Sequence, residues 1–153
     1  MVLLSDLLTS MRVRVPLEAT TKEEILRELV DVLAEDQAIG DRQDVLRVVR
    51  EREKVLSTGI GHGVALPHGK SDACPDLSIA AGVTREPIDF DALDQEPVQL
   101  IFLLVGPESA AGPHIKALSR ISRLVRQPEL RQQLKEAQDS QAFLDVLREA
   151  ETG

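Results

Sequence analysis

Residues Val98–Val105 read "VQLIFLLV", and this stretch decides the fold class. A short run of branched and aromatic residues, interrupted only by Gln99, is typical of a strand that is covered on both faces. Leu77–Val83, "LSIAAGV", has the same character. Neither run approaches the roughly 20 apolar residues that a membrane span needs. The two stretches therefore predict the buried centre of a sheet, and no direct insertion into a membrane is expected.

Further strands and helices are predicted on both sides of this centre. Arg12–Val15 alternates as an edge strand does, and Gly63–Leu66 is a weaker strand candidate. Helical periodicity begins after the capping pair Thr21 and Glu24 and stops at Gly40. Further helices are expected over Asp41–Lys54, from Gly112 past Val125, around Glu129–Ala137 and around Gln141–Glu149. Because strands and helices are intermixed, the expected fold is an α/β sandwich in which a central mixed β-sheet is flanked by helices on both faces.

Length and composition narrow the possible functions. The chain has 153 residues, the size of one ordinary domain, so residues 1–153 are expected to form a single unit. Asp and Glu number 26 against 18 Lys and Arg, and the net charge of −8 repels nucleic acid phosphates. No nucleic acid partner is therefore expected. Cys74 is the only cysteine, which favours a reducing compartment, so the expected location is the cytoplasm.

His68 lies in a glycine-rich segment, Ser57–Asp72, that follows the second predicted helix. Pro67 fixes its own backbone angle and favours an extended chain before it, so His68 is predicted to be presented at the end of a short strand. Glycines around it allow backbone N–H groups to approach an anion closely. The glycines with this expected phosphate-binding role are Gly61, Gly63 and Gly69.

Two further residues are candidates for the same site. His114 follows a predicted loop, Pro107–Pro113, at the expected start of a helix, where the positive end of the helix dipole favours a negative ligand. Arg52, near the end of the second helix, could add a fixed cation, although arginines in a charged run are more often solvated. If the two histidines converge, one could attack a phosphoryl group while the other donates a hydrogen bond to its oxygens.

The motif around His68 resembles a known family signature. Glu53, six residues, and then "IGHGVALPHG" look like the pattern of the fructose- and mannitol-type enzyme IIA domains of the bacterial phosphoenolpyruvate-dependent sugar phosphotransferase system. The similarity extends from "LLSDLLTS" to the last helix and so covers nearly the whole chain. The amino-terminal segment and "STGIG" resemble the nitrogen-regulatory branch. His62 stands where that branch commonly has asparagine, and its role is left open.

The resemblance implies a phosphohistidine carrier that needs no cofactor and no metal. His68 would accept a phosphoryl group from the histidine-containing phosphocarrier protein, and His114 and Arg52 would contact the phosphate. The group would then pass to a transporter subunit, or the protein would act as a regulator of a target protein. A neutral imidazole nitrogen is nucleophilic near neutral pH, which suits this chemistry.

Alternatives remain open from the residues alone. The fold could serve as a protein-interaction module without phosphorylation. The three histidines, His62, His68 and His114, could in principle form a zinc site, but no H-E-x-x-H helix accompanies them. Cys74 is expected to be inert. Three arginines on the His114 helix, at positions 120, 123 and 126, are expected to be solvated charges, with a docking surface as the alternative.

Overall fold

The computed structural model describes residues 3–55 and 57–152; the predicted unit 1–153 also includes residues 1, 2, 56 and 153, which lie outside this part. The two apolar runs form the centre of a mixed sheet, as predicted: β5 (Ser78–Ile88) and β6 (Val98–Gly106) pair antiparallel. The predicted edge strand is confirmed as β1 (Val13–Leu17), which lies parallel to β5 at one end of the strand order. β5 extends five residues beyond the predicted run.

Three short strands complete the other side of β6. β3 (Val64–Ala65) and β4 (His68–Lys70) follow each other along β6, both parallel to it, and β2 (Gly59–Gly61) pairs antiparallel with β3. Pro67 interrupts the strand but its carbonyl still accepts a hydrogen bond from Leu104 N at 3.0 Å. The prediction that His68 stands at the end of a strand is therefore wrong, because His68 begins β4 after this interruption.

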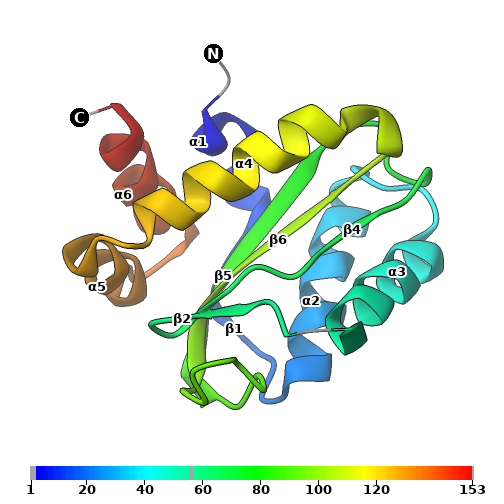
Figure 1. The fold of residues 1–153 in the computed structure, drawn as a ribbon. Coiled ribbons are helices and arrows are strands. Elements are labelled where there is room, and N and C mark those ends of the chain that lie inside the picture. Colours follow the sequence, from blue (N-terminus) through cyan, green and yellow to red (C-terminus); the bar gives the residue numbers. More distant parts are fainter. Residues whose placement is uncertain (1–2, 56, 153) are drawn as a thin grey trace.

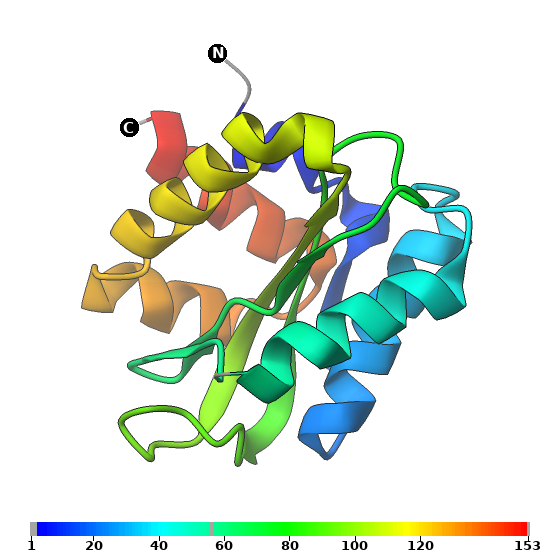
Figure 2. The ribbon, with the colours of Figure 1, turned by 45° about the vertical axis from the view of Figure 1, so that its right-hand side comes forward.

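Helices cover both faces of the sheet, which confirms the predicted α/β sandwich (Figures 1 and 2). One face packs against α2 (Lys22–Glu35) and α3 (Arg42–Val55). The other face packs against four helices: α1 (Leu4–Leu7), α4 (Ala111–Leu124), α5 (Pro128–Glu136) and α6 (Ser140–Thr152). Among the described residues, no helix is both long enough and apolar enough to cross a membrane.

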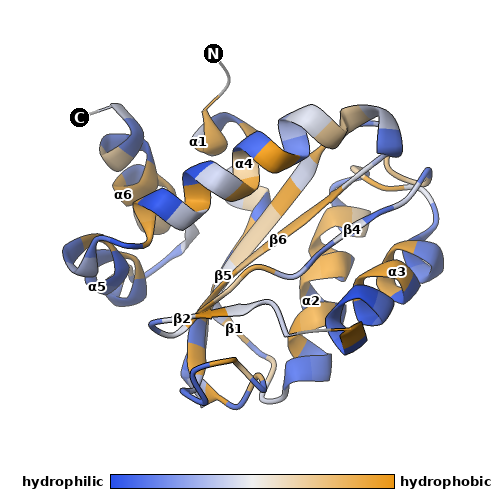
Figure 3. Cartoon of the chain, viewed as in Figure 1, coloured by the Kyte–Doolittle hydropathy of each residue, from blue (hydrophilic) through white to orange (hydrophobic). Residues whose placement is uncertain are grey.

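The alternation of β6 side chains divides the core into two layers. Ile101, Leu103 and Val105 belong to the cluster beneath α2 and α3, whereas Phe102 and Leu104 belong to the cluster beneath α4 to α6. Successive strand residues point to opposite faces, so a strand buried on both sides is apolar at almost every position. Figure 3 shows β5 and β6 coloured mainly as hydrophobic, between helices with mixed faces.

The predicted capping residues mark the starts of α2 and α3 correctly, but the glycine predicted to stop α2 lies beyond the end of that helix. Thr21 Oγ1 accepts a hydrogen bond from Glu24 N at 3.2 Å, as the N-cap of α2, while the Glu24 carboxylate binds the Thr20 N–H at 3.1 Å. α2 ends at Glu35, before the predicted Gly40. Asp41 caps α3 as predicted, since its Oδ1 accepts from Asp44 N at 3.1 Å.

The predicted loop 107–113 is mostly helical. A short 3-10 turn spans Glu108–Ala110, and α4 begins at Ala111. Gly112 and Pro113 therefore lie inside the first turn of α4. The N–H groups of a first turn make no hydrogen bond within the helix, so a proline is accepted there. His114 is the fourth residue of α4 and so lies in its first turn, near the predicted helix start.

Candidate functional site

His68 projects from β4 toward α4. It pairs in register with Leu104, a residue of the core beneath α4, so the two side chains share that face. The ring is half-buried, and its Nδ1 lies 2.8 Å from the carbonyl oxygen of Leu66. A carbonyl can only accept a hydrogen bond, so in the neutral ring Nδ1 carries the proton and Nε2 keeps the free electron pair. The local chain thus selects the tautomer in which Nε2 is unprotonated and able to act as a nucleophile.

His114 lies against His68 from the first turn of α4. The two ring centroids are 5.6 Å apart and the rings meet edge to face at 69°. Only 3% of His114 is exposed, and within the described part of the chain neither of its ring nitrogens has a hydrogen-bond partner. A buried polar group without a partner costs about 1–3 kcal/mol. The fold therefore leaves the imidazole of His114 unpaired beside His68. An oxygen-bearing group attached to His68 would provide an acceptor for the N–H of His114.

Both imidazoles are held neutral. Burial, with smaller contributions from His68 and Lys70, lowers the pKa of His114 to about 4. Burial also lowers the pKa of His68; the hydrogen bond to Leu66 opposes this change, and the positive charge of Arg52 adds to it. Neutral His68 can act as a nucleophile near pH 7, and neutral His114 can donate one N–H without carrying a charge.

A row of α3 residues brings Arg52 to His68. Asp44, Val48 and Arg52 recur every four residues and so share one stripe of the helix. Asp44 Oδ2 accepts a hydrogen bond from Ser71 Oγ at 2.5 Å, and the Val48 side chain packs against Gly69. The third member, Arg52, then lies one turn further on, and its charge lowers the pKa of His68. The structure thus brings together His68, His114 and Arg52.

Lys70 is a site residue that the motif does not predict. It lies two positions after His68 in β4, on the same face of the strand, and its charge lowers the pKa of both histidines. Its ammonium group also lies 3.6 Å from the carboxylate of Glu108. The sequence signal for it is the two-residue period of a strand, which is visible only once residues 68–70 are recognised as a strand.

The three glycines expected to bind phosphate do not share one place. A Cβ atom on Gly69 would lie 3.1 Å from Val48 Cγ2 and 3.3 Å from Val49 N, so this glycine allows α3 to approach β4 closely. Gly61 and Gly63 lie in the β2–β3 hairpin with φ of 97° and 78°. Four strand residues, about 13 Å, separate the start of β3 from His68. The structure does not bring these two hairpin glycines to His68.

His62 and Cys74 lie apart from the site chemistry. His62 is exposed at the turn of the β2–β3 hairpin with φ of 58°, a left-handed conformation that asparagine and histidine adopt more readily than most residues. Cys74 is buried, which raises the pKa of its thiol to about 11. Within residues 3–55 and 57–152, no group of three or more His, Cys, Asp or Glu side chains is placed to hold a metal ion.

The three arginines predicted for the His114 helix differ from one another: Arg120 and Arg123 lie in α4, whereas Arg126 lies beyond its end. Arg123 and Arg126 are exposed, as predicted. Arg120 is instead largely covered, with its guanidinium 3.6 Å from the buried carboxylate of Glu151, which also accepts two backbone hydrogen bonds from the start of α1. The prediction of a solvated charge is therefore wrong for Arg120, because α6 returns an acidic residue to it.

Comparison with known proteins gives consistent matches. The family described as "Phosphoenolpyruvate-dependent sugar phosphotransferase system, EIIA 2" matches residues 6–150. A nitrogen regulatory protein of Bradyrhizobium diazoefficiens is 37% identical over 144 residues, which are 94% of each chain. The fructose-specific EIIABC component of Bacillus subtilis is 35% identical over 146 residues, which are 95% of this chain but 23% of that protein.

Solved structures agree. The nitrogen regulatory protein IIA-Ntr of Neisseria meningitidis superposes with a TM-score of 0.87 at 33% identity, covering 94% of this chain and 98% of that one. The Escherichia coli enzyme IIA for mannitol, solved in complex with phosphorylated enzyme IIB, shares the fold with a TM-score of 0.79 at 17% identity, over 92% and 96% of the two chains. With a family match across nearly the whole sequence and a shared architecture, the chain belongs to the EIIA type 2 family of the phosphoenolpyruvate-dependent sugar phosphotransferase system.

Proposed function

We propose that this EIIA domain, formed by residues 1–153, is a cytoplasmic phosphohistidine carrier with His68 as its phosphoacceptor. The observation that carries the proposal is the pairing of His68 with an unpartnered buried imidazole: Nε2 of His68 is the free nitrogen, and His114 lacks an acceptor beside it. Arg52 and Lys70 add positive charge around the same ring. Such a site favours an incoming phosphoryl group.

In the proposed step, the electron pair of His68 Nε2 forms a bond to the phosphorus of a phosphohistidine on the donor. The N–P bond of the donor breaks at the same time, and the donor imidazole leaves with that electron pair. Nδ1–H of His68 continues to donate to Leu66, which keeps the ring in place through the transfer. His114 and Arg52 stabilise the oxygens of the phosphoryl group as charge moves.

Membership of the family supports a proposal for the donor and the acceptor. We propose the histidine-containing phosphocarrier protein as the donor. The acceptor is an enzyme IIB-type transporter subunit or a regulated target protein. A nitrogen regulatory protein and a fructose-specific EIIA component match this chain at 37% and 36% identity, over 94% and 84% of its length, so the proposal includes both kinds of acceptor.

The test is phosphorylation of the purified chain. Incubation with phosphoenolpyruvate, enzyme I and the phosphocarrier protein should add one phosphoryl group, seen by intact mass, that is labile in acid and stable in alkali. His68→Ala should abolish it. His62→Ala is the matched control, because His62 is exposed in the hairpin, and it should be phosphorylated like the wild type. A wild-type chain that stays unmodified with an active donor would overturn the carrier proposal in favour of an interaction module.

A further inference from the structure

Glu53, the acidic residue that opens the family motif, is buried between three partners. Its side chain is 4% exposed, and Oε1 lies 3.0 Å from the ammonium group of Lys22. Oε1 also accepts the N–H of Thr58 at 3.0 Å, and Oε2 accepts the Thr58 hydroxyl at 2.6 Å. A buried carboxylate is expensive unless its charge and electron pairs are matched, and here both oxygens are.

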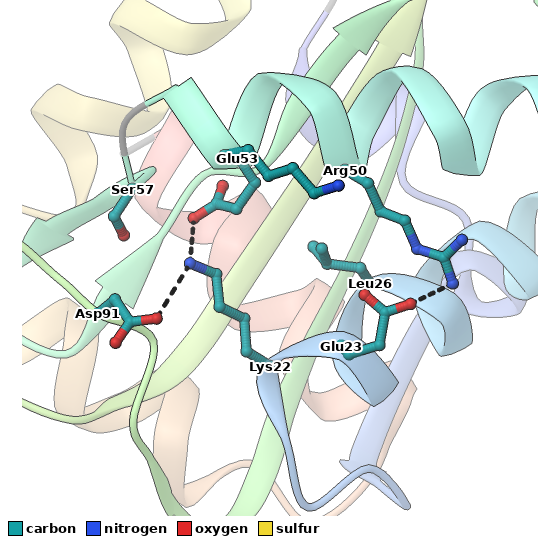
Figure 4. A pocket seen from close by; sticks show the side chains of 8 residues that line it. Lys22, Glu23, Leu26, Arg50, Glu53, Ser57 and Asp91 are labelled. Atoms are coloured by element: carbon teal, nitrogen blue, oxygen red, sulfur yellow. Dashed lines mark ion pairs between the residues drawn. The ribbon is translucent and has the colours of Figure 1, made fainter.

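Figure 4 shows the surroundings of this carboxylate, a cavity of about 640 Å³ between α2 and α3. Lys22 lies between Glu53 and Asp91, with its ammonium group 3.8 Å from the second carboxylate. Arg50 forms an ion pair with Glu23 on the opposite side. The charged side chains of this cavity thus form ion pairs with one another. The arrangement needs no added ligand to balance its charges, and its role is to hold neighbouring groups in place.

Thr58 connects Glu53 to the site. The Thr58 carbonyl accepts a hydrogen bond from Leu66 N at 3.0 Å, and the Leu66 carbonyl accepts the one from His68 Nδ1 at 2.8 Å. Glu53 therefore fixes Thr58 by two hydrogen bonds, Thr58 fixes Leu66, and Leu66 fixes the His68 ring.

We propose that Glu53 is a positioning residue for phosphoryl acceptance, holding His68 in its Nδ1–H tautomer through Thr58 and the carbonyl of Leu66. This inference rests on the proposed role of His68 as the phosphoacceptor. A carbonyl held at one place and angle favours one imidazole tautomer, as residues behind metal-binding histidines do. When the carbonyl is released, the ring populates the Nε2–H tautomer, in which the attacking nitrogen is blocked.

The experiment measures the tautomer directly. Long-range ¹H–¹⁵N NMR of the full ¹⁵N-labelled chain, at a pH above the titration range of His68, distinguishes a protonated Nδ1 from a protonated Nε2. The wild type should show Nδ1–H, and Glu53→Gln should shift the population toward Nε2–H. The rate of phosphoryl acceptance should fall in proportion to the lost Nδ1–H fraction, about tenfold if one tenth remains, because only that fraction is competent.

Two further variants separate positioning from folding. Thr58→Val removes the hydroxyl that donates to Glu53 and should shift the tautomer in the same direction, whereas Thr58→Ser keeps the hydroxyl and should restore it. Glu23→Gln is the matched control: it removes the same charge from the same cavity, but Glu23 pairs with Arg50 and not with Thr58. It should leave the His68 tautomer unchanged.

The proposal is overturned if folded Glu53→Gln and Thr58→Val proteins both retain the Nδ1–H tautomer, or if Glu23→Gln shifts it equally, which would indicate a general charge effect. Failure of the proposed function gives a different pattern. In that case the tautomer shifts as expected in the variants, while the wild type accepts no phosphoryl group.

Discussion

His68 and His114 are neighbours that differ in burial and in hydrogen bonding. His68 is half-buried and has one nitrogen fixed by a backbone carbonyl, whereas His114 is almost fully buried and has neither nitrogen paired. The proposed nucleophile, His68, needs a defined tautomer and access to its partner, and its ring has a fixed Nδ1 and is partly exposed. A donor that acts only when an anion arrives needs a fixed position and no competing acceptor. The comparison teaches that two identical side chains can be placed in different hydrogen-bonding states, which suit the two roles proposed for them.

The largest expected effect concerns the charge beside His68. Arg52→Met should slow phosphoryl acceptance about 100-fold, because it removes a cation that stabilises the transferring oxygens. Single-turnover transfer from the phosphorylated donor protein measures this rate. Arg50→Met is the matched control, since it removes the same charge from the same helix but from a residue paired with Glu23. Equal losses in the two variants would show that only the overall charge matters.

The next effect tests the burial of His114 through pH. The folded-state pKa of His114, about 4, lies below the value near 6.5 of an unfolded chain, so the unfolded state binds more protons between these values. The free energy of unfolding should therefore fall as the pH drops from about 6.5 toward 4. The loss attributable to His114 is about 2 kcal/mol at pH 4.5.

Urea unfolding of the wild type and of His114→Leu at pH 7 and 4.5 isolates this contribution. The variant should lose about 2 kcal/mol less than the wild type on acidification, while accepting phosphoryl groups more slowly. If both proteins lose the same free energy, His114 is not held neutral by burial, and the contrast with His68 disappears.

The smallest effect concerns the packing of β4, the strand that carries His68, against α3. Gly69→Ala should destabilise the protein by about 1 kcal/mol, because the new methyl group lies too close to Val48 and to the backbone of α3. Thermal unfolding measures the change. Gly112→Ala, where a Cβ meets nothing within 4 Å, should be neutral or slightly stabilising. A neutral Gly69→Ala would mean that α3 is not held tightly against β4.

The central elements are predictable because burial leaves a mark on the sequence. β5 and β6 are covered on both faces and are therefore apolar at nearly every position, and α2 and α3 carry caps at Thr21 and Asp41. β2 and β4 leave no such mark. Each has three residues and contains glycine, and each is a strand only because a neighbouring strand offers its hydrogen-bonding edge.

The sequence predicts three of the residues that meet at the candidate site, but not their connections, and two of the three predicted glycines lie elsewhere. His68, His114 and Arg52 come together as the motif and the helix positions indicate. The place of Lys70 depends on which face of β4 its side chain occupies. The link from Glu53 to Thr58 depends on a side chain of α3 that reaches the residue before the β2–β3 hairpin. Periodicity reports which side of one element is buried, but not which atom of another element it contacts.

The match between α3 and β4 restricts how this sequence can change in length. Four helix residues advance about 6 Å and two strand residues about 6.6 Å, so the stripe of Asp44, Val48 and Arg52 stays in step with β4 in the opposite direction. One inserted residue between Asp44 and Arg52 would rotate the guanidinium by 100° around the helix axis, away from the imidazole. Insertions are therefore compatible with the turns that flank α3 and β4, but the number of residues between Asp44 and Arg52 is fixed.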